Sequence, residues 1–272
     1  MGFILHFSCT AWGTGLRQNQ HMPSENADAA TRIRAAVARV QALRQSGETS
    51  PSLGAAVLHI KQIQSRRFAS TYADLLASAQ YQSAARFFLD ELYSTRDYAQ
   101  RDAQFARIAG TLQTVFPRQV VQTAVALAEL HADTETLDHQ MAQAWLAQDG
   151  TGDDAERYLQ AWRSTGQRDA RNAQLAGVLF IGRELERLTR LPGLRLMLKM
   201  MRRPAQAAGL DALQQFLEAG FDTFAALARH PQGVAQFLER IESREAALMR
   251  DLFDAPAVTC GTQLRQLLGQ AR

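Results

Sequence analysis

Apolar residues recur every three or four positions along the chain after Met22, and no segment there alternates apolar and polar residues for long. The first spacing is typical of amphipathic helices, and the missing alternation argues against half-buried strands. The pattern therefore predicts an all-α protein, a multi-helix bundle of about eight to ten helices with no β-sheet.

Cap residues and breakers suggest where the first helices begin and end. We expect the first helix to follow Ser24 and to stop at Gly47. A later helix is expected to begin at Asp97, because Asp97 and Gln100 have the spacing of a capping box. Pro117 then ends that helix, since proline lacks the backbone N–H that a helix interior needs.

The longest apolar stripe predicts a helix over residues 118–148, with a spacing close to the 3.5 residues of bundle packing. Residues 210–228 and 234–253 read as two helices, and we expect them to pair as an antiparallel hairpin. A short final helix is expected over residues 263–268.

The clearest loop is the segment 149–154, which contains two glycines and three aspartates. It divides the chain into an N-terminal helical half, 23–148, and a C-terminal half, 155–272, which we expect to pack together as one domain. Residues 1–22 match nothing that follows, and we expect a poorly ordered extension that arises from an upstream start site.

Composition places the chain among soluble globular proteins, with 46% hydrophobic and 21% charged residues and a net charge of +3. No apolar stretch is long enough to span a membrane. The two cysteines, Cys9 and Cys260, have no metal-binding or redox spacing. That usage fits a reducing compartment, so we expect a cytoplasmic protein.

The most distinctive segment lies between Arg67 and Pro117 and contains AARFFLDELYSTRDYAQRDAQFARI. It resembles a family of uncharacterised bacterial proteins that share an FFLxxLY core followed by a polar step and RD. The resemblance extends to MMRRPAQAAGLDALQQFLEAGF, residues 200–221. It implies a helical bacterial protein without an assigned activity. Ser94 stands where many relatives have glycine.

The polar residues of this motif form the first candidate site. Asp97, Arg101 and Asp102, with Tyr93 beside them, could bind a ligand or a partner. In the structural alternative, which we favour, Asp97 caps a helix and Arg101 pairs with a carboxylate to lock two helices together.

A second candidate lies in the long helix, where His131, Glu135 and His139 follow one another at intervals of four and share a face. Such a face could hold a metal ion. A di-iron bundle needs Glu-x-x-His pairs, and the sequence contains none. We therefore favour a solvated helix flank and expect no metal or other cofactor.

A third candidate is the basic segment 183–203, with seven basic residues against two acidic ones. It could bind an anionic partner such as nucleic acid, although a solvated face paired with acids from other helices is the favoured alternative. The candidate binding residues are Arg183, Arg187, Arg190, Lys199, Arg202 and Arg203.

Nucleophile elbows, P-loops and dinucleotide fingerprints are absent from the sequence. We expect the helices to bury their apolar faces against one another and to leave no reactive cleft. The leading hypothesis is therefore a non-enzymatic protein that acts through contact with a protein, either another copy or a different chain. An enzyme or sensor with a small-molecule or metal site inside the bundle is the alternative, and a nucleic-acid accessory protein is the third.

Overall fold

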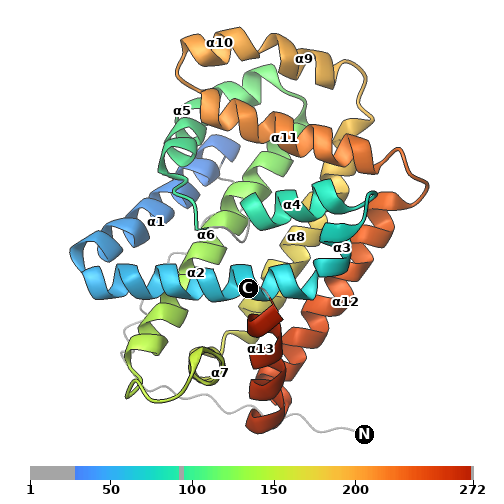
Figure 1. Ribbon diagram of the computed structural model, residues 1–272. Helices are drawn as coiled ribbons and strands as arrows, with labels where there is room; N and C mark the ends of the chain where they lie inside the picture. The colour runs from blue at the N-terminus through green and yellow to red at the C-terminus, as the bar shows by residue number, and fades with distance from the viewer. Residues whose placement is uncertain (1–27, 92–94, 271–272) are drawn as a thin grey trace, which may run out of the picture.

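The computed structural model describes residues 28–91 and 95–270. This part of the chain is entirely helical, with no strand, as the spacing of apolar residues predicts (Figure 1). Its elements are α1 (Ala29–Thr49), α2 (Pro51–Thr71), α3 (Ala73–Ala77), α4 (Gln82–Glu91), α5 (Ala99–Val115), α6 (Arg118–Leu146), α7 (Asp154–Thr165), α8 (Arg168–Thr189), α9 (Leu194–Met200), α10 (Arg202–Ala207), α11 (Asp211–Leu227), α12 (Gly233–Asp254) and α13 (Ala257–Gln270).

Helix α6 is the central element, and its bounds agree closely with the expected long helix. It packs against α1, α2, α7 and α8, so both halves of the sequence are arranged around it. Helices α11 and α12 pack on α8, and α13 packs on α2 and α7. Helices α9 and α10 lie together at one end of the molecule (Figure 1).

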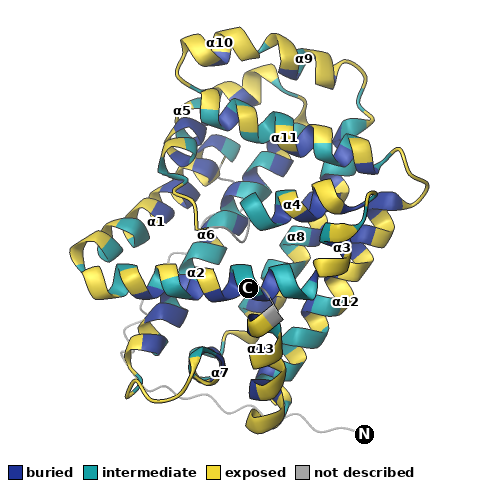
Figure 2. Cartoon of the chain, viewed as in Figure 1, coloured by how far each residue is buried: buried dark blue, intermediate teal, exposed yellow. Residues whose placement is uncertain are grey.

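The core consists of several apolar clusters rather than one layer. One cluster joins α2, α6, α7, α12 and α13 around Trp145 and Trp162, and another joins α1, α5, α6 and α11 around Ile33. A third surrounds Tyr72 and Phe237 and includes residues of α2, α4, α8, α11 and α12. Figure 2 shows the buried faces of these helices turned toward one another.

The expectation of eight to ten helices is too low, because short helices interrupt what the sequence presents as continuous or irregular segments. The chain bends at Tyr72, which separates α3 from α2 while its ring is fully buried. The segment after Met201 forms the unexpected α10, where Pro204 lies in the first turn and so needs no helical N–H partner. The final helix is longer than expected and begins at Ala257.

Three local expectations also need correction. Helix α1 continues through Gly47 to Thr49, and Gly47 meets Gly54 of α2 at close range. The N-cap of α5 is Tyr98, whereas Asp97 accepts a hydrogen bond from Ala99 N at 2.8 Å in a local turn. Helices α11 and α12 cross steeply and do not form an antiparallel hairpin, because each packs on α8 (Figure 1).

The start of α1 is fixed by Asp28, whose side chain accepts a hydrogen bond from Thr31 N at 2.7 Å. The expected extension, residues 1–22, and the expected start after Ser24 lie outside the described residues. Among the helices of the described segments, none combines the length and the apolar character needed to cross a membrane.

Candidate functional site

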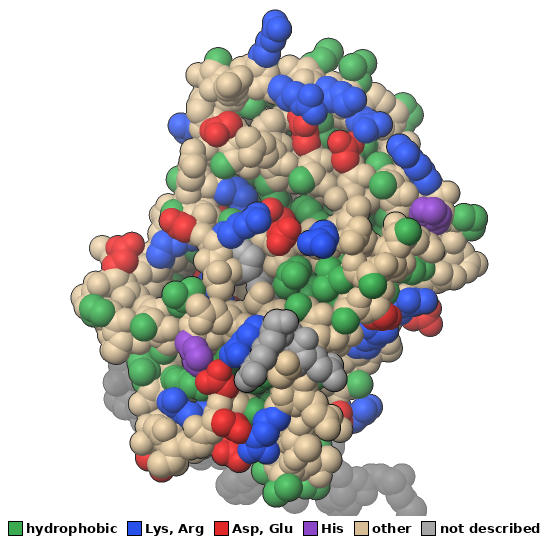
Figure 3. Space-filling model, viewed as in Figure 1, with side chains coloured by type: hydrophobic (Ala, Val, Ile, Leu, Met, Phe, Trp, Pro, Cys, Tyr) green, Lys and Arg blue, Asp and Glu red, His purple; other side chains and the backbone are tan. Residues whose placement is uncertain are grey.

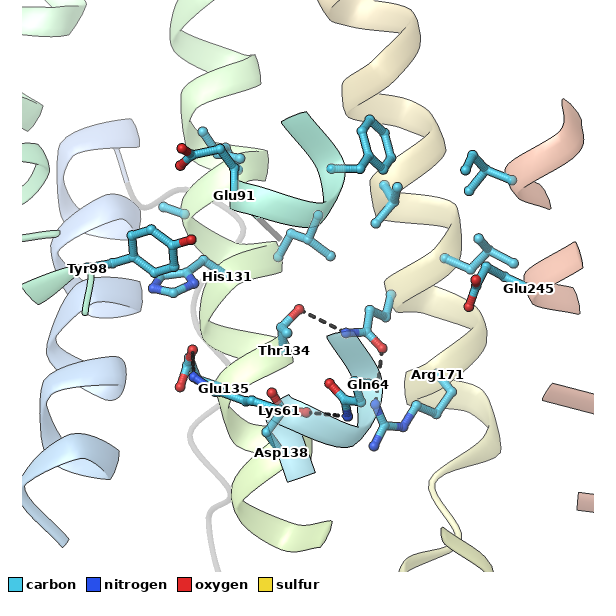
Figure 4. Close-up of a pocket in the computed structure, with 18 of the residues that line it drawn as sticks. Lys61, Gln64, Glu91, Tyr98, His131, Thr134, Glu135, Asp138, Arg171 and Glu245 are labelled. Atoms are coloured by element: carbon cyan, nitrogen blue, oxygen red, sulfur yellow. Dashed lines mark hydrogen bonds and ion pairs between the residues drawn. The ribbon is translucent and has the colours of Figure 1, made fainter. Parts of the chain in front are cut away.

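A cavity of about 120 Å³ lies inside the bundle, and polar side chains from seven helices line part of it (Figure 4). The expectation of an interior without a cleft is therefore not met. The cavity is bounded by α2, α4, α6, α7, α8, α11 and α12, by the start of α5 and by Val37 of α1. Its polar lining comprises Lys61, Gln64, Arg67, Glu91, Tyr98, Arg101, Asp102, His131, Thr134, Glu135, Asp138, Tyr158, Arg171, Gln174 and Glu245.

Two of the candidate sites predicted from sequence meet at this cavity. His131 Nε2 of α6 lies 3.2 Å from Asp102 Oδ2 of α5, and Arg44 Nη2 donates to the same oxygen at 2.9 Å. Burial acts to raise the pKa of Asp102, but the hydrogen bonds from His131 and Arg44 outweigh it and hold the pKa below its usual value.

Arg101 also faces the cavity, where its Nη1 donates to Glu91 Oε2 at 2.8 Å. Its guanidinium lies over the rings of Tyr98 and Phe216, at 3.9 and 4.5 Å from their centroids. Burial raises the pKa of Glu91 although the charge of Arg101 opposes that change. These contacts connect the start of α5 to the end of α4 and to α11.

Two other residues of that candidate are placed differently. Asp97 is exposed and does not line the cavity, and its Oδ1 lies 3.9 Å from Arg44 Nε. Tyr93 lies outside the described residues.

One turn further along α6, Glu135 Oε1 forms an ion pair with Nζ of Lys61, which lies on α2, at 2.5 Å. Gln64 Nε2 donates to Asp138 Oδ1 at 2.9 Å in a fully buried contact. Burial raises the pKa of Asp138, because nearby Lys61 only partly offsets the loss of water. The surroundings of this carboxyl therefore disfavour its charged form, as they do for Glu91.

Between α2 and α12, Arg67 Nη1 pairs with Glu245 Oε1 at 2.5 Å. Tyr72 Oη donates to the same oxygen at 2.8 Å. Both charged side chains are buried. This ion pair joins α2 to α12 across the core, so it contributes to the architecture of the cavity.

Arg171 of α8 differs from the other cations of the lining. Its residue is only 5% exposed, and among the described residues no carboxylate lies within ion-pair distance. Nη1 donates to Gln174 Oε1 at 3.3 Å, whereas Nη2 is buried without a hydrogen-bond partner. Figure 4 shows the guanidinium reaching from α8 toward Gln64.

The metal candidate does not assemble. His131 contacts Asp102, Glu135 pairs with Lys61, and His139 Nε2 lies 3.3 Å from Ser46 Oγ. Within the described ranges, no group of three or more His, Cys, Asp or Glu side chains could hold a metal ion.

The basic segment 183–203 lies on the surface, and most of its arginines contact carboxylates. Arg183 lies 3.7 Å from Glu242, Arg190 pairs with Glu186, and Arg195 lies 3.0 Å from Asp222. Arg187 pairs with Glu184, and Arg202 with Glu218. Figure 3 shows basic side chains gathered over α9 and α10 with acidic ones beside them.

Sequence reasoning missed several cavity residues, although their spacing carries a signal. His131, Thr134, Glu135 and Asp138 follow at i, i+3, i+4 and i+7, so they form one polar stripe on α6. Polar residues also interrupt the apolar faces of α2, α8 and α12, at positions where the helical pattern predicts a buried apolar side chain. These missed residues are Lys61, Gln64, Arg67, Arg171, Gln174 and Glu245.

Comparison with known proteins places the chain in a family but supplies no activity. The match to the family model spans residues 43–258, which include both segments that carry the resemblance noted above. No curated protein and no solved structure matches the chain. Since the family model covers well over half of the sequence, the chain belongs to the family described as "Domain of unknown function (DUF8198)".

Proposed function

We propose that the protein binds a small organic anion in the interior cavity. The observation that carries the proposal is the buried guanidinium of Arg171, with one nitrogen that has no hydrogen-bond partner. Leaving a buried charged donor without a partner is costly, so such a group in a cavity favours an anionic acceptor.

The charges around the cavity support this reading. Lys61, Arg67 and Arg101 each have a carboxylate partner, so these pairs contribute little net charge. The remaining cation of the lining is Arg171, whereas the Asp138 carboxyl, whose pKa burial raises, accepts a hydrogen bond from Gln64. Arg171 is therefore the cation of the lining that is left to pair with an added anion.

A second donor lies next to this cation. The Arg171 guanidinium stacks on Trp162 at 4.3 Å from the ring centroid, and Trp162 Nε1 is also buried without a partner. Both residues line the cavity. A carboxylate, which has two oxygens, offers an acceptor for each of these donors.

Calorimetric titration of the full chain at pH 7 with butanoate, inorganic phosphate and neutral butanamide tests the proposal. We expect butanoate to bind and butanamide to bind far more weakly. Arg171→Gln should weaken butanoate binding at least about tenfold, because a hydrogen bond to a charged group contributes about 1.5–3 kcal/mol.

The matched control is Arg183→Gln, since Arg183 is exposed on the same helix. It should leave butanoate binding unchanged. Equal binding of butanoate and butanamide, or butanoate binding that survives Arg171→Gln, would refute the proposal.

Contact with a protein is the second candidate, and the outer face of α9 favours it. Leu196 and Met200 are 62% and 65% exposed and lie one turn apart. A second copy of the chain is the simplest partner for such a face. Sedimentation velocity over a range of concentrations should then show dimers that Leu196→Ser with Met200→Ser abolishes, and a concentration-independent monomer would exclude it.

Nucleic-acid binding through 183–203 is less favoured, because carboxylates already face most of these arginines. We expect any of these functions to operate in the cytoplasm, since the cysteine usage suits a reducing compartment.

A further inference from the structure

A second cavity of about 120 Å³ adjoins the polar one and is lined almost entirely by hydrocarbon and aromatic groups. It lies among α4, α5, α6, α8, α9 and α11. Leu127, Val178 and Phe216 line both cavities, so the two spaces meet at shared apolar side chains. Polar and apolar spaces of similar size thus lie side by side.

We infer that the ligand of this protein is an amphipathic monocarboxylate, with its carboxylate at Arg171 and its hydrocarbon part in the apolar cavity. The inference rests on the proposed function, because it assigns the head group to the same cation. It adds the hydrocarbon part of the ligand, which the polar cavity alone does not define.

A single negative charge fits the cavity better than a phosphate dianion. Of the Lys and Arg side chains that line the polar cavity, Arg171 is the one without an acidic partner among the described residues. Glu135, Glu245 and Glu91 already pair with the other three. A second negative charge would face these carboxylates without a cation to balance it.

The size of the apolar cavity limits the hydrocarbon part. Protein interiors are normally filled closely, and an apolar void forfeits contacts that an apolar occupant restores. An engineered cavity of roughly 150 Å³ takes up benzene, so a space of this size suits one ring or a chain of about six carbons. A long acyl chain would not fit.

Titration of the full chain with acetate, butanoate, hexanoate, octanoate and palmitate tests the inference. We expect the affinity to rise about fourfold for each added methylene, as burial of about 0.8 kcal/mol per CH₂ requires. The rise should stop near hexanoate or octanoate, and palmitate should bind no more tightly than octanoate.

Ala124→Leu provides the structural test, because Ala124 lines the apolar cavity and not the polar one. It should remove most of the gain between acetate and octanoate while acetate affinity stays unchanged. Leu185→Phe should act in the same way and serves as the second filling variant. Ala126→Leu is the matched control, since Ala126 lies on α6 and lines neither cavity.

The outcomes separate the two claims. Equal, Arg171-dependent affinity at all chain lengths would overturn the amphipathic ligand and leave the anion site intact. A gain with chain length that Ala124→Leu and Leu185→Phe both leave in place would also overturn it. No Arg171-dependent binding at any length would overturn both claims.

Discussion

The Arg67–Glu245 pair shows how much a single buried contact can contribute. The two side chains are only 8% and 10% exposed, so removing one partner leaves a charge in a place where water cannot replace it. We predict that Glu245→Ala lowers the free energy of unfolding by about 3–5 kcal/mol. Urea denaturation measures the change.

The control for this prediction is Glu242→Ala on the same helix. Glu242 is 54% exposed and lies 3.7 Å from Arg183, so its loss should cost less than about 1 kcal/mol. Similar losses from the two variants would contradict the special role assigned to the buried pair.

Asp138 makes stability depend on pH in a definite direction. Burial raises its pKa above the ordinary value of 3.8, so the folded chain binds this proton more tightly than the unfolded chain does. The contribution of Asp138 to stability therefore falls as pH rises from 3.8 through the folded pKa.

We predict that Asp138→Asn, which removes this titration and can still accept from Gln64, becomes more stable relative to the wild type as pH rises through that window. The slope cannot exceed about 1.4 kcal/mol per pH unit for one proton. Denaturation of both proteins in parallel from pH 4 to 8 measures the difference. A difference that shrinks with rising pH would contradict the assignment.

At the scale of elements, the corner between α1 and α2 depends on two glycines. A Cβ on Gly54 would lie 2.9 Å from Gly47 O, a backbone atom that cannot turn aside. We predict that Gly54→Ala destabilises the protein by about 1–3 kcal/mol, although alanine is the better helix former.

Gly261→Ala is the contrasting variant, because nothing lies within 4 Å of its added Cβ inside α13. It should stabilise the protein by about 0.5–1 kcal/mol. Thermal unfolding of the two variants measures the contrast, and the prediction fails if both shift the midpoint in the same direction.

The elements themselves could be predicted well where one face is apolar over many turns, as in α6 and α12. Their ends were predicted less well, because tertiary contacts overrule local signals. Gly47 is a helix breaker in sequence but is kept helical by its contact with α2, and Asp97 has a capping pattern that a local turn uses differently. The crossing of α11 and α12 depends on α8, which no local pattern reveals.

At the scale of the whole molecule, some residues of the candidate site could be predicted from the sequence, but the fact that they lie together in one cavity could not. Asp102 and His131 belonged to two separate hypotheses, and only the packing of α5 on α6 joins them. Arg171 gave no motif at all. Its significance depends on which groups it does not contact, and that property exists only in three dimensions.

The packing of both sequence halves on α6 predicts that the two halves unfold cooperatively. Helix α6 contributes Met141 and Trp145 to one apolar cluster and Val125 and Ala132 to another, so one rigid helix carries both. Each cluster also draws residues from both the 23–148 and the 155–272 half. Loss of either cluster should therefore expose part of α6 and weaken the other.

We predict that the halves unfold in a single transition. Ile33→Ala in α1 and Leu264→Ala in α13 each remove a fully buried side chain and should each cost about 2–5 kcal/mol. In a Trp12→Phe background, fluorescence reports Trp145 and Trp162 in the cluster that contains Leu264, whereas circular dichroism reports all helices. Both signals should shift together in both variants, because two-state unfolding gives coincident curves. An early loss of helix in Ile33→Ala without a change in fluorescence would show that the α1 region unfolds independently.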